Sequence, residues 1–358
     1  MSILVVSNMY PSKEFPFYGT FVQKITEGLI DNGHDCKIVA ISKIENKRFF
    51  KLIGYINFYI NIIYSIIKYK PSCVYLHFPS HTGLPVLFIK LFRKFKIIAH
   101  FHGGDLINQS QRSKYFFKLK EIINNNVISK SELVVLPSNS FFNLISKTYK
   151  LKEDKVIITP SGGVDCDFFN FKSRVTRTCK ILFVARLVPV KRPLLMSDCI
   201  KSFYHECPEY SQFVEVTVVG SGPLSITLKK ELKGYNVKYL ELASQKQLRQ
   251  IYKENDILIQ TSEYESLGLV PLEFMSTGGI AMCIDIPAFR EYISSGENGF
   301  IFKDPSDFVR CMKKYILMDK LSFGMMSNQS RNTVLNRYNS CRTLKVLSNK
   351  LNEISSKV

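Results

Sequence analysis

The stretch Asp256-Ile-Leu-Ile-Gln-Thr-Ser-Glu-Tyr-Glu-Ser-Leu-Gly-Leu-Val-Pro-Leu-Glu273 decides how this chain folds. Its apolar start, residues 256–260, predicts a short strand, and residues 272–277 predict a helix. Pro271 suits the first helical turn, because its missing N–H would have no intrahelical partner there. We therefore expect Glu265 in the loop between strand and helix, and Glu273 early in the helix.

The start of this predicted helix favours an anion, typically phosphate, because its free N–H groups and positive dipole end are available there. Two carboxylates beside that point would repel the phosphate itself, but they can accept hydrogen bonds from hydroxyl groups. A sugar joined to a phosphate offers both partners. The alternative is that Glu265 and Glu273 are an ordinary loop residue and an ordinary first-turn residue, since the spacing of two residues alone is a weak signal.

Further along the chain in both directions, strand-like and helix-like stretches alternate. The strand-like stretches are residues 3–7, 35–41, 73–78, 97–101 and 133–137, and then 180–185, 214–219, 237–240, 256–260 and 280–284. This alternation predicts an α/β protein with a parallel sheet in each half. At 358 residues the chain is also too long for one core of the usual size. We predict domains at residues 1–168 and 169–339, and a C-terminal helical segment at 340–358.

Residues 262–278 resemble the signature of retaining glycosyltransferases of the family 4, or group 1, type. Further segments resemble other motifs of that family and follow in its order, namely residues 7–11, 18–22, 32–41, 100–105, 161–165, 185–191 and 220–223. The resemblance covers nearly the whole chain. It implies the GT-B fold, in which two facing Rossmann-like, doubly wound parallel-sheet domains enclose a cleft. It also implies an N-terminal acceptor-binding domain, a C-terminal nucleotide-sugar-binding domain, and a last helix that crosses back to the first domain.

The resemblance places the donor site in the C-terminal half. Arg186 and Lys191 follow the first strand of that half, where a planar guanidinium and a mobile ammonium would clamp a diphosphate. Fixed cations stabilise the negative charge that builds on the diphosphate as the sugar leaves. Without the resemblance, these two residues would be solvated surface cations. The other implied contacts to the donor nucleotide are Gly19, Gly220, Glu273 on the ribose, and the backbone of Ser266, Leu267, Gly268, Leu269 and Val270.

The resemblance also implies transfer with retention and without a dedicated nucleophile. Glu265 would bind hydroxyls of the donor sugar, while the donor phosphate would help to take the acceptor proton on the same face. His102 would contact the donor sugar or the acceptor; the alternative is a loop imidazole satisfied by backbone. Asp105 would orient or deprotonate the acceptor hydroxyl. Three further histidines follow or end strands: His77 and His81 as acceptor-side candidates, and His100, expected on the opposite face of its strand from His102 in a structural role.

No metal and no cofactor beyond the nucleotide sugar is expected. Asp165-Cys-Asp167 is an Asp-x-Asp triplet, which binds a divalent cation in another glycosyltransferase class, but it lies away from the phosphate segments. Gly220-Ser-Gly222 lacks the third glycine of a dinucleotide fingerprint, which disfavours a dehydrogenase. We expect a UDP- or GDP-linked hexose as donor. The alternatives are a nucleotide-sugar epimerase of the same fold and a catalytically inactive nucleotide-binding module.

The formal net charge of the chain is +19. Between residues 47 and 120 the single acidic residue is Asp105, and aromatic residues interleave with the cations Lys47, Arg48, Lys51, Lys68, Lys70, Lys90, Arg93, Lys94, Lys96, Arg112, Lys114, Lys118 and Lys120. This composition suits an anionic membrane surface, whereas no nucleic-acid-binding motif accompanies it. Residues 52–67 are expected to be too short to span a membrane, and Asn57 and Asn61 interrupt them. The alternative is a generic basic surface.

Cysteine usage and the N-terminus bear on location. The nine cysteines are scattered without a C-x-x-C pair, which predicts neither a zinc site nor a disulfide framework and favours a reducing cytosol. The first residues, Met-Ser-Ile-Leu-Val-Val-Ser, read as a short buried strand and not as a signal peptide. We therefore predict a cytoplasmic protein, peripheral on the inner face of the cytoplasmic membrane, that acts on a lipid-linked or other saccharide acceptor.

Overall fold

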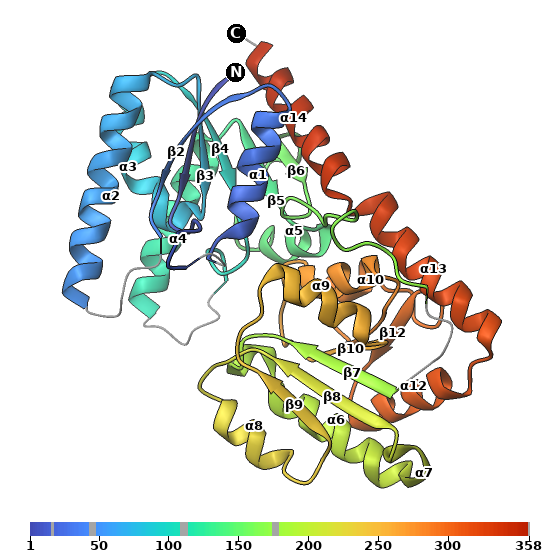
Figure 1. Cartoon of the computed structure of the whole chain (residues 1–358). Coiled ribbons are helices and arrows are strands. Elements are labelled where there is room, and N and C mark those ends of the chain that lie inside the picture. The colour runs from blue at the N-terminus through green and yellow to red at the C-terminus, as the bar shows by residue number, and fades with distance from the viewer. Residues whose placement is uncertain (16–17, 43–47, 108–113, 174–178, 357–358) are drawn as a thin grey trace. The chain divides into compact units, whose positions relative to one another are not determined.

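The computed structural model describes residues 1–15, 18–42, 48–107, 114–173 and 179–356. It divides into two compact units, unit 1 (residues 1–163 and 341–358) and unit 2 (residues 164–340), where the sequence suggested boundaries after residues 168 and 339 (Figure 1). Lys47 and Arg112 of the predicted basic region lie outside the described residues.

Unit 1 contains a six-stranded sheet in the order β2-β1-β3-β4-β5-β6, with all neighbouring strands parallel. The strands are β1 (Ser2–Ser7), β2 (Asp35–Ala40), β3 (Cys73–His77), β4 (Lys96–His100), β5 (Leu133–Leu136) and β6 (Val156–Ile158). The chain order reverses between β1 and β3, because β2 lies on the other side of β1. In open sheets of this kind, ligands bind at the carboxyl ends of the strands beside such a reversal.

Helices cover both faces of this sheet (Figure 1). They are α1 (Thr20–Asp31), α2 (Arg48–Tyr69), α3 (Pro79–Lys90), α4 (Lys114–Lys130), α5 (Asn139–Ile145) and α14 (Ser340–Ser356), with a 3₁₀ turn at Glu153–Lys155. Leu344, Leu347 and Leu351 of α14 are buried in one cluster with Ile25 and Leu29 of α1 and with side chains of the sheet. The last helix of the chain is therefore part of the core of unit 1.

Unit 2 contains a second six-stranded parallel sheet, in the order β12-β11-β10-β7-β8-β9. Its strands are β7 (Cys179–Val184), β8 (Val214–Val219), β9 (Val237–Leu240), β10 (Ile257–Gln260), β11 (Ile280–Ile284) and β12 (Gly299–Phe302). Its helices are α6 (Pro193–Glu206), α7 (Pro208–Ser211), α8 (Ser225–Glu231), α9 (Gln245–Glu254), α10 (Leu269–Ser276), α11 (Pro287–Arg290), α12 (Pro305–Leu317) and α13 (Lys320–Arg337), with a 3₁₀ turn at Pro189–Lys191. Here the chain order reverses between the central strands β7 and β10.

The predicted doubly wound parallel sheets are both present. Strands β6 and β12 were not predicted, and each lies at an edge of its sheet. They have three and four residues and are less completely buried than the central strands, so their apolar signal is short. Long buried runs such as β3, in which all residues are buried, produce the stronger pattern typical of parallel strands.

Helix α2 corrects one expectation about the membrane. The window Phe49–Tyr69 has a mean hydropathy of 1.4 and is long and apolar enough, by length and composition alone, to cross a membrane. The expectation that this segment is too short is wrong, because Asn57 and Asn61 remain inside a continuous helix. Only 22% of the window is buried. Phe58, Ile62 and Ile66 form the buried seam, so most of this apolar helix faces outward from unit 1.

Candidate active site

Two loops of unit 2 meet at the carboxyl ends of β7 and β8. The N–H of Ala185 donates to the carbonyl of Val219 at 3.0 Å, and the N–H of Leu187 donates to that of Ser221 at 3.0 Å. Gly220 has φ +139°, and a Cβ there would lie 1.9 Å from the Ala185 carbonyl oxygen. Glycine is therefore required for this approach. These contacts bring the loops of Gly220 and Arg186 together, as expected for two predicted contacts to the donor nucleotide. The Arg186 side chain is exposed.

The loops after β7 and β10 are joined by an ion pair between Lys191 Nζ and Glu265 Oε1. The two side chains are only 19% and 14% exposed. The Ser262 hydroxyl donates to the same carboxylate oxygen at 2.8 Å, and the Thr261 hydroxyl donates to the carbonyl of Lys191 at 3.0 Å. Because β7 and β10 flank the reversal of chain order, this pair lies where doubly wound sheets bind ligands.

Helix α10 begins beside this pair. Gly268 precedes it with φ +84°, and a Cβ there would lie 2.8 Å from the ring of Phe289. The helix runs from Leu269 to Ser276, earlier than the expected 272–277, and Pro271 lies in its first turn as predicted. The N–H groups of Leu269 and Val270 at the helix start have no intrahelical acceptor, which suits an anion.

Glu273 lies one turn into α10. Its Oε2 accepts a hydrogen bond at 3.0 Å from the hydroxyl of Tyr252, a fully buried residue of α9. The bond fixes the carboxylate that the sequence assigned to a ribose. The sequence does not indicate this role of Tyr252, because no local pattern links a tyrosine in one helix to a glutamate in the next.

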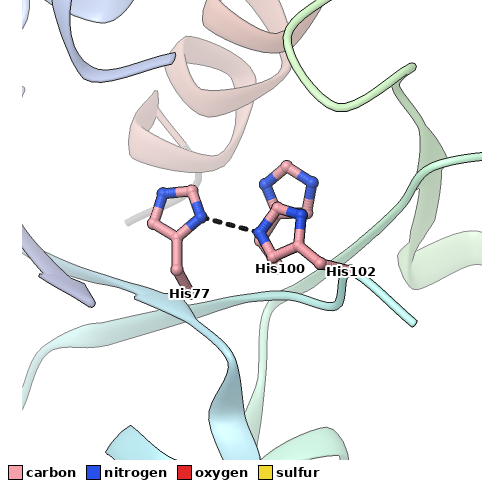
Figure 2. Close-up of side chains that lie close together, drawn as sticks. All are labelled: His77, His100 and His102. Carbon is pink, nitrogen blue, oxygen red and sulfur yellow. Dashed lines mark hydrogen bonds between the residues drawn. The ribbon is translucent and has the colours of Figure 1, made fainter. Parts of the chain in front are cut away.

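In unit 1, three histidines gather at the carboxyl ends of β3 and β4. His77 and His100 end these strands and are direct partners in the sheet register. His77 Nδ1 and His102 Nε2 are hydrogen-bonded at 2.9 Å, and the rings of His100 and His102 are 4.1 Å apart between centroids (Figure 2). The expectation that His100 faces away from His102 is wrong, since residues two apart lie on the same face of an extended chain.

The imidazoles are held neutral. Burial lowers the pKa of His77 to about 3, and burial first, with neighbouring imidazoles second, lowers the pKa of His100 and His102 well below the ordinary value. The Tyr75 hydroxyl fixes His100 through Nδ1 at 2.9 Å. Neutral imidazole is a common metal ligand, and one nitrogen from each ring lies within 4.8 Å of the others, so the set has the composition of a transition-metal site. In the structure, however, His77 and His102 are hydrogen-bonded to each other. That the protein works without a metal ion stays a prediction.

Asp105 supports the loop that carries His102. Its Oδ1 accepts hydrogen bonds from the backbone N–H groups of His102 at 3.2 Å and Gly103 at 3.0 Å, and the residue is fully buried. Burial raises the pKa of this carboxyl to about 6, in spite of these bonds. The geometry favours a positioning role for Asp105; the predicted contact with an acceptor stays a prediction.

Gly19, a predicted donor contact, and Asp165, from the triplet that was not expected to bind metal, each support the backbone around them. Gly19 precedes α1 with φ +80°, and a Cβ there would lie 2.7 Å from the carbonyl carbon of Met9, so this glycine permits close packing within unit 1. Its contact with a diphosphate stays a prediction. Asp165 accepts hydrogen bonds from the backbone N–H groups of Asp167 at 3.2 Å and Phe168 at 2.9 Å, so this carboxylate caps a turn.

Residues 167–332 match the family model described as "Glycosyl transferases group 1". The chain is 30% identical over 166 residues to the sulfoquinovosyl transferase of Arabidopsis thaliana, a match that covers 42% of this chain and 31% of that protein. It is 25% identical over 224 residues to the N-acetyl-alpha-D-glucosaminyl L-malate synthase of Bacillus anthracis, covering 58% and 54%. The chain thus spans about a third to a half of the length of these relatives.

Solved structures resemble the whole chain. Sucrose-phosphate synthase from Thermosynechococcus elongatus has a TM-score of 0.79 at 13% identity and full coverage of both chains. Anabaena HepE, solved in complex with UDP and glucose, has a TM-score of 0.75 at 14% identity and covers 99% of this chain and 100% of its own. The chain therefore has the GT-B fold, and its residues 167–332 match the model of the group 1 glycosyltransferases.

Proposed function

We propose that this protein is a retaining glycosyltransferase that moves a hexose-type sugar from a UDP- or GDP-linked donor to a hydroxyl of a membrane-associated, lipid-linked saccharide. The observation that carries the proposal is the Lys191–Glu265 pair at the reversal of chain order in unit 2. It combines a cation for phosphate with a carboxylate for sugar hydroxyls, beside the start of α10.

Each part of a nucleotide sugar has a partner among these residues. Arg186, Lys191 and the first N–H groups of α10 would hold the diphosphate, and Glu273, fixed by Tyr252, would hold the ribose. Cations placed before the reaction stabilise the charge that develops on the leaving diphosphate. Among the similar proteins, Anabaena HepE was solved with UDP and glucose, and pneumococcal GtfA was solved with UDP and GlcNAc.

The surroundings of Glu265 support a binding role for this carboxylate. Retaining glycosidases use one of two carboxyl groups as the nucleophile. Glu265 instead pairs with Lys191 and accepts from Ser262, and these donors lower the nucleophilicity of the carboxylate. The donor phosphate would then take the acceptor proton, and neutral His102 would offer a hydrogen bond without adding charge. Transfer with retention and without metal follows as the proposed chemistry.

The membrane part of the proposal rests on the surface of α2, α3 and α4. Exposed apolar side chains include Leu52 and Ile60 of α2, Phe88 of α3 and Leu119 of α4. In residues 48–120 the single carboxylate is that of Asp105, which is fully buried. Glu121, which is partly exposed, is the one carboxylate within α2, α3 and α4. An apolar surface with several cations and so little negative charge suits the interface of an anionic bilayer.

The first test is binding of UDP, GDP, ADP and CMP, and of their sugar conjugates, by calorimetry with and without EDTA. We expect one nucleoside diphosphate to bind tightly and independently of EDTA. Arg186→Ala should weaken its binding at least tenfold, whereas Lys233→Ala, an exposed cation elsewhere in unit 2, should leave it unchanged. Failure of every nucleotide to bind would reject the proposal. Conversion of the donor sugar in the absence of acceptor would favour an epimerase instead.

A further inference from the structure

Unit 1 contains a cavity of about 680 Å³ that the donor chemistry does not use. Residues from the loops after β1 and β2 line it, together with α2, α3 and α4; among them are Asn8, Ser42 and His81. The volume lies within the range of about 300–1,000 Å³ that is typical of small-molecule sites. The cavity therefore adjoins the strand ends at which a sheet of this order binds ligands.

The polar part of the lining can recognise hydroxyl groups. The Tyr59 hydroxyl donates to the carbonyl of His81 at 2.9 Å, and the Ser80 hydroxyl is hydrogen-bonded to His81 Nδ1 at 2.8 Å, so this side of the cavity is held in place. Asn8 Oδ1 is buried and has no hydrogen-bond partner within the described part of the chain. A buried acceptor of this kind calls for a donor such as a hydroxyl group or a water molecule.

The charged part of the lining is positive. Lys51 from α2 and Lys120 from α4 both line the cavity, and none of the described lining residues carries a carboxylate. Glu121 follows Lys120 in α4 but does not line the cavity. Asp105 is fully buried and hydrogen-bonded to its own loop. Two ammonium groups from two helices favour a ligand with a compact negative charge, of which a phosphate group is the usual biological form.

The rim of the cavity is apolar. Leu84 of α3, Phe116 and Leu119 of α4 line the cavity and are also exposed. Helix α2, which also lines the cavity, carries further exposed apolar side chains, including Leu52 and Ile56. A ligand with a charged head in the cavity and a hydrocarbon chain over this rim would bury apolar surface that the protein leaves in water.

We infer that this cavity binds an anionic amphiphile, with a phosphate or diphosphate near Lys51 and Lys120 and a lipid chain that leaves over Leu84 and Leu119. The inference rests on the proposed function, because it identifies the acceptor as a lipid phosphate that carries the saccharide. It also gives the apolar surface of α2 and α4 a second use: the same side chains that meet the bilayer guide the lipid chain of the acceptor into the cavity.

The test is calorimetric binding of farnesyl diphosphate to the full chain with a saturating concentration of the nucleoside diphosphate, which occupies the diphosphate site of unit 2. We expect Lys51→Ala and Lys120→Ala each to weaken binding at least tenfold. Lys130→Ala, which removes an exposed cation of α4 that does not line the cavity, should leave binding unchanged. Circular dichroism of each variant verifies that its fold is intact.

Two further probes separate the parts of the ligand. Farnesol and inorganic pyrophosphate should each bind at least tenfold more weakly than farnesyl diphosphate, because each lacks one of the two features. Equal binding of pyrophosphate would show a site for free phosphate and overturn the lipid part. Unchanged binding in the folded Lys51→Ala/Lys120→Ala double variant would overturn the whole inference. If the nucleotide binds but the amphiphile does not, this inference fails while the proposed function stands.

Discussion

Replacing Lys191 with methionine tests the centre of the candidate site. The change keeps most of the length of the side chain but removes the ammonium group. Glu265 then keeps its charge but loses one of its two hydrogen-bond donors, and Ser262 remains. Both side chains are less than one fifth exposed, so solvent compensates little. Loss of a charge-assisted hydrogen bond to a largely buried carboxylate costs about 2–3 kcal/mol. For a unit of this size, the cost lowers the midpoint of thermal unfolding by about 4–12 °C.

The double variant Lys191→Met/Glu265→Gln makes this reasoning quantitative. Glutamine keeps an acceptor for Ser262 but carries no charge, so the double variant leaves neither partner with an uncompensated charge. Its loss of unfolding free energy should be smaller than the sum of the two single losses by about 1–3 kcal/mol. Urea unfolding of the full chain measures all four proteins. Additive losses would refute the claim that the pair is a single unit.

The same variants separate stability from catalysis. If Lys191 stabilises charge on the leaving diphosphate, Lys191→Met should lower kcat about 10²–10³-fold, as removal of other preorganised partners of developing charge does. The double variant should regain stability but not turnover. Recovery of turnover along with stability would mean that the pair holds the loops together and has no role in the reaction.

Three other predictions follow from particular positions. Gly220→Ala places a Cβ against the Ala185 carbonyl and should destabilise unit 2 by more than about 3 kcal/mol, whereas Gly234→Ala, at φ +92° with open space around it, should cost only about 1 kcal/mol in denaturant unfolding. Asp105 has a pKa raised from 3.8 to about 6, so it favours the folded state below pH 4 and loses that contribution as pH rises through 6. The wild type should therefore lose up to about 3 kcal/mol of unfolding free energy relative to Asp105→Asn between pH 4 and pH 7, and a pH-independent difference would contradict the assigned burial. Leu52→Glu/Ile60→Glu should abolish flotation with anionic liposomes, while Leu317→Glu, an exposed leucine of unit 2, should not; equal flotation of the two variants would argue against α2 as the membrane surface.

The ends of the central strands, and the loops that follow them, could be predicted from the sequence. The loops that carry Arg186, Gly220 and Glu265 were placed correctly after strands, because each follows a short buried apolar run. The pairing of Lys191 with Glu265 was not predicted, because it depends on β10 lying beside β7. No local sequence pattern determines the order of strands in a sheet. The bond from Tyr252 to Glu273 and the register that sets His77 beside His100 are long-range in the same sense. The error about α2 has another origin: asparagines lower helix propensity only slightly, so two of them do not end a helix.

The placement of α14 also affects how the protein is made. Residues 164–340 form unit 2 as one uninterrupted stretch, whereas the core of unit 1 includes a helix that is synthesised only after unit 2 is complete. Until then Ile25 and Leu29 lack the leucines that bury them, and Gly28, whose Cβ would lie 2.3 Å from a methyl of Leu344, leaves a gap on α1. A nascent chain therefore exposes an apolar face of its first unit throughout the synthesis of its second. A variant that ends at residue 340 lacks the part of α14 that belongs to unit 1. We expect unit 1, and not unit 2, to fail to fold in this variant.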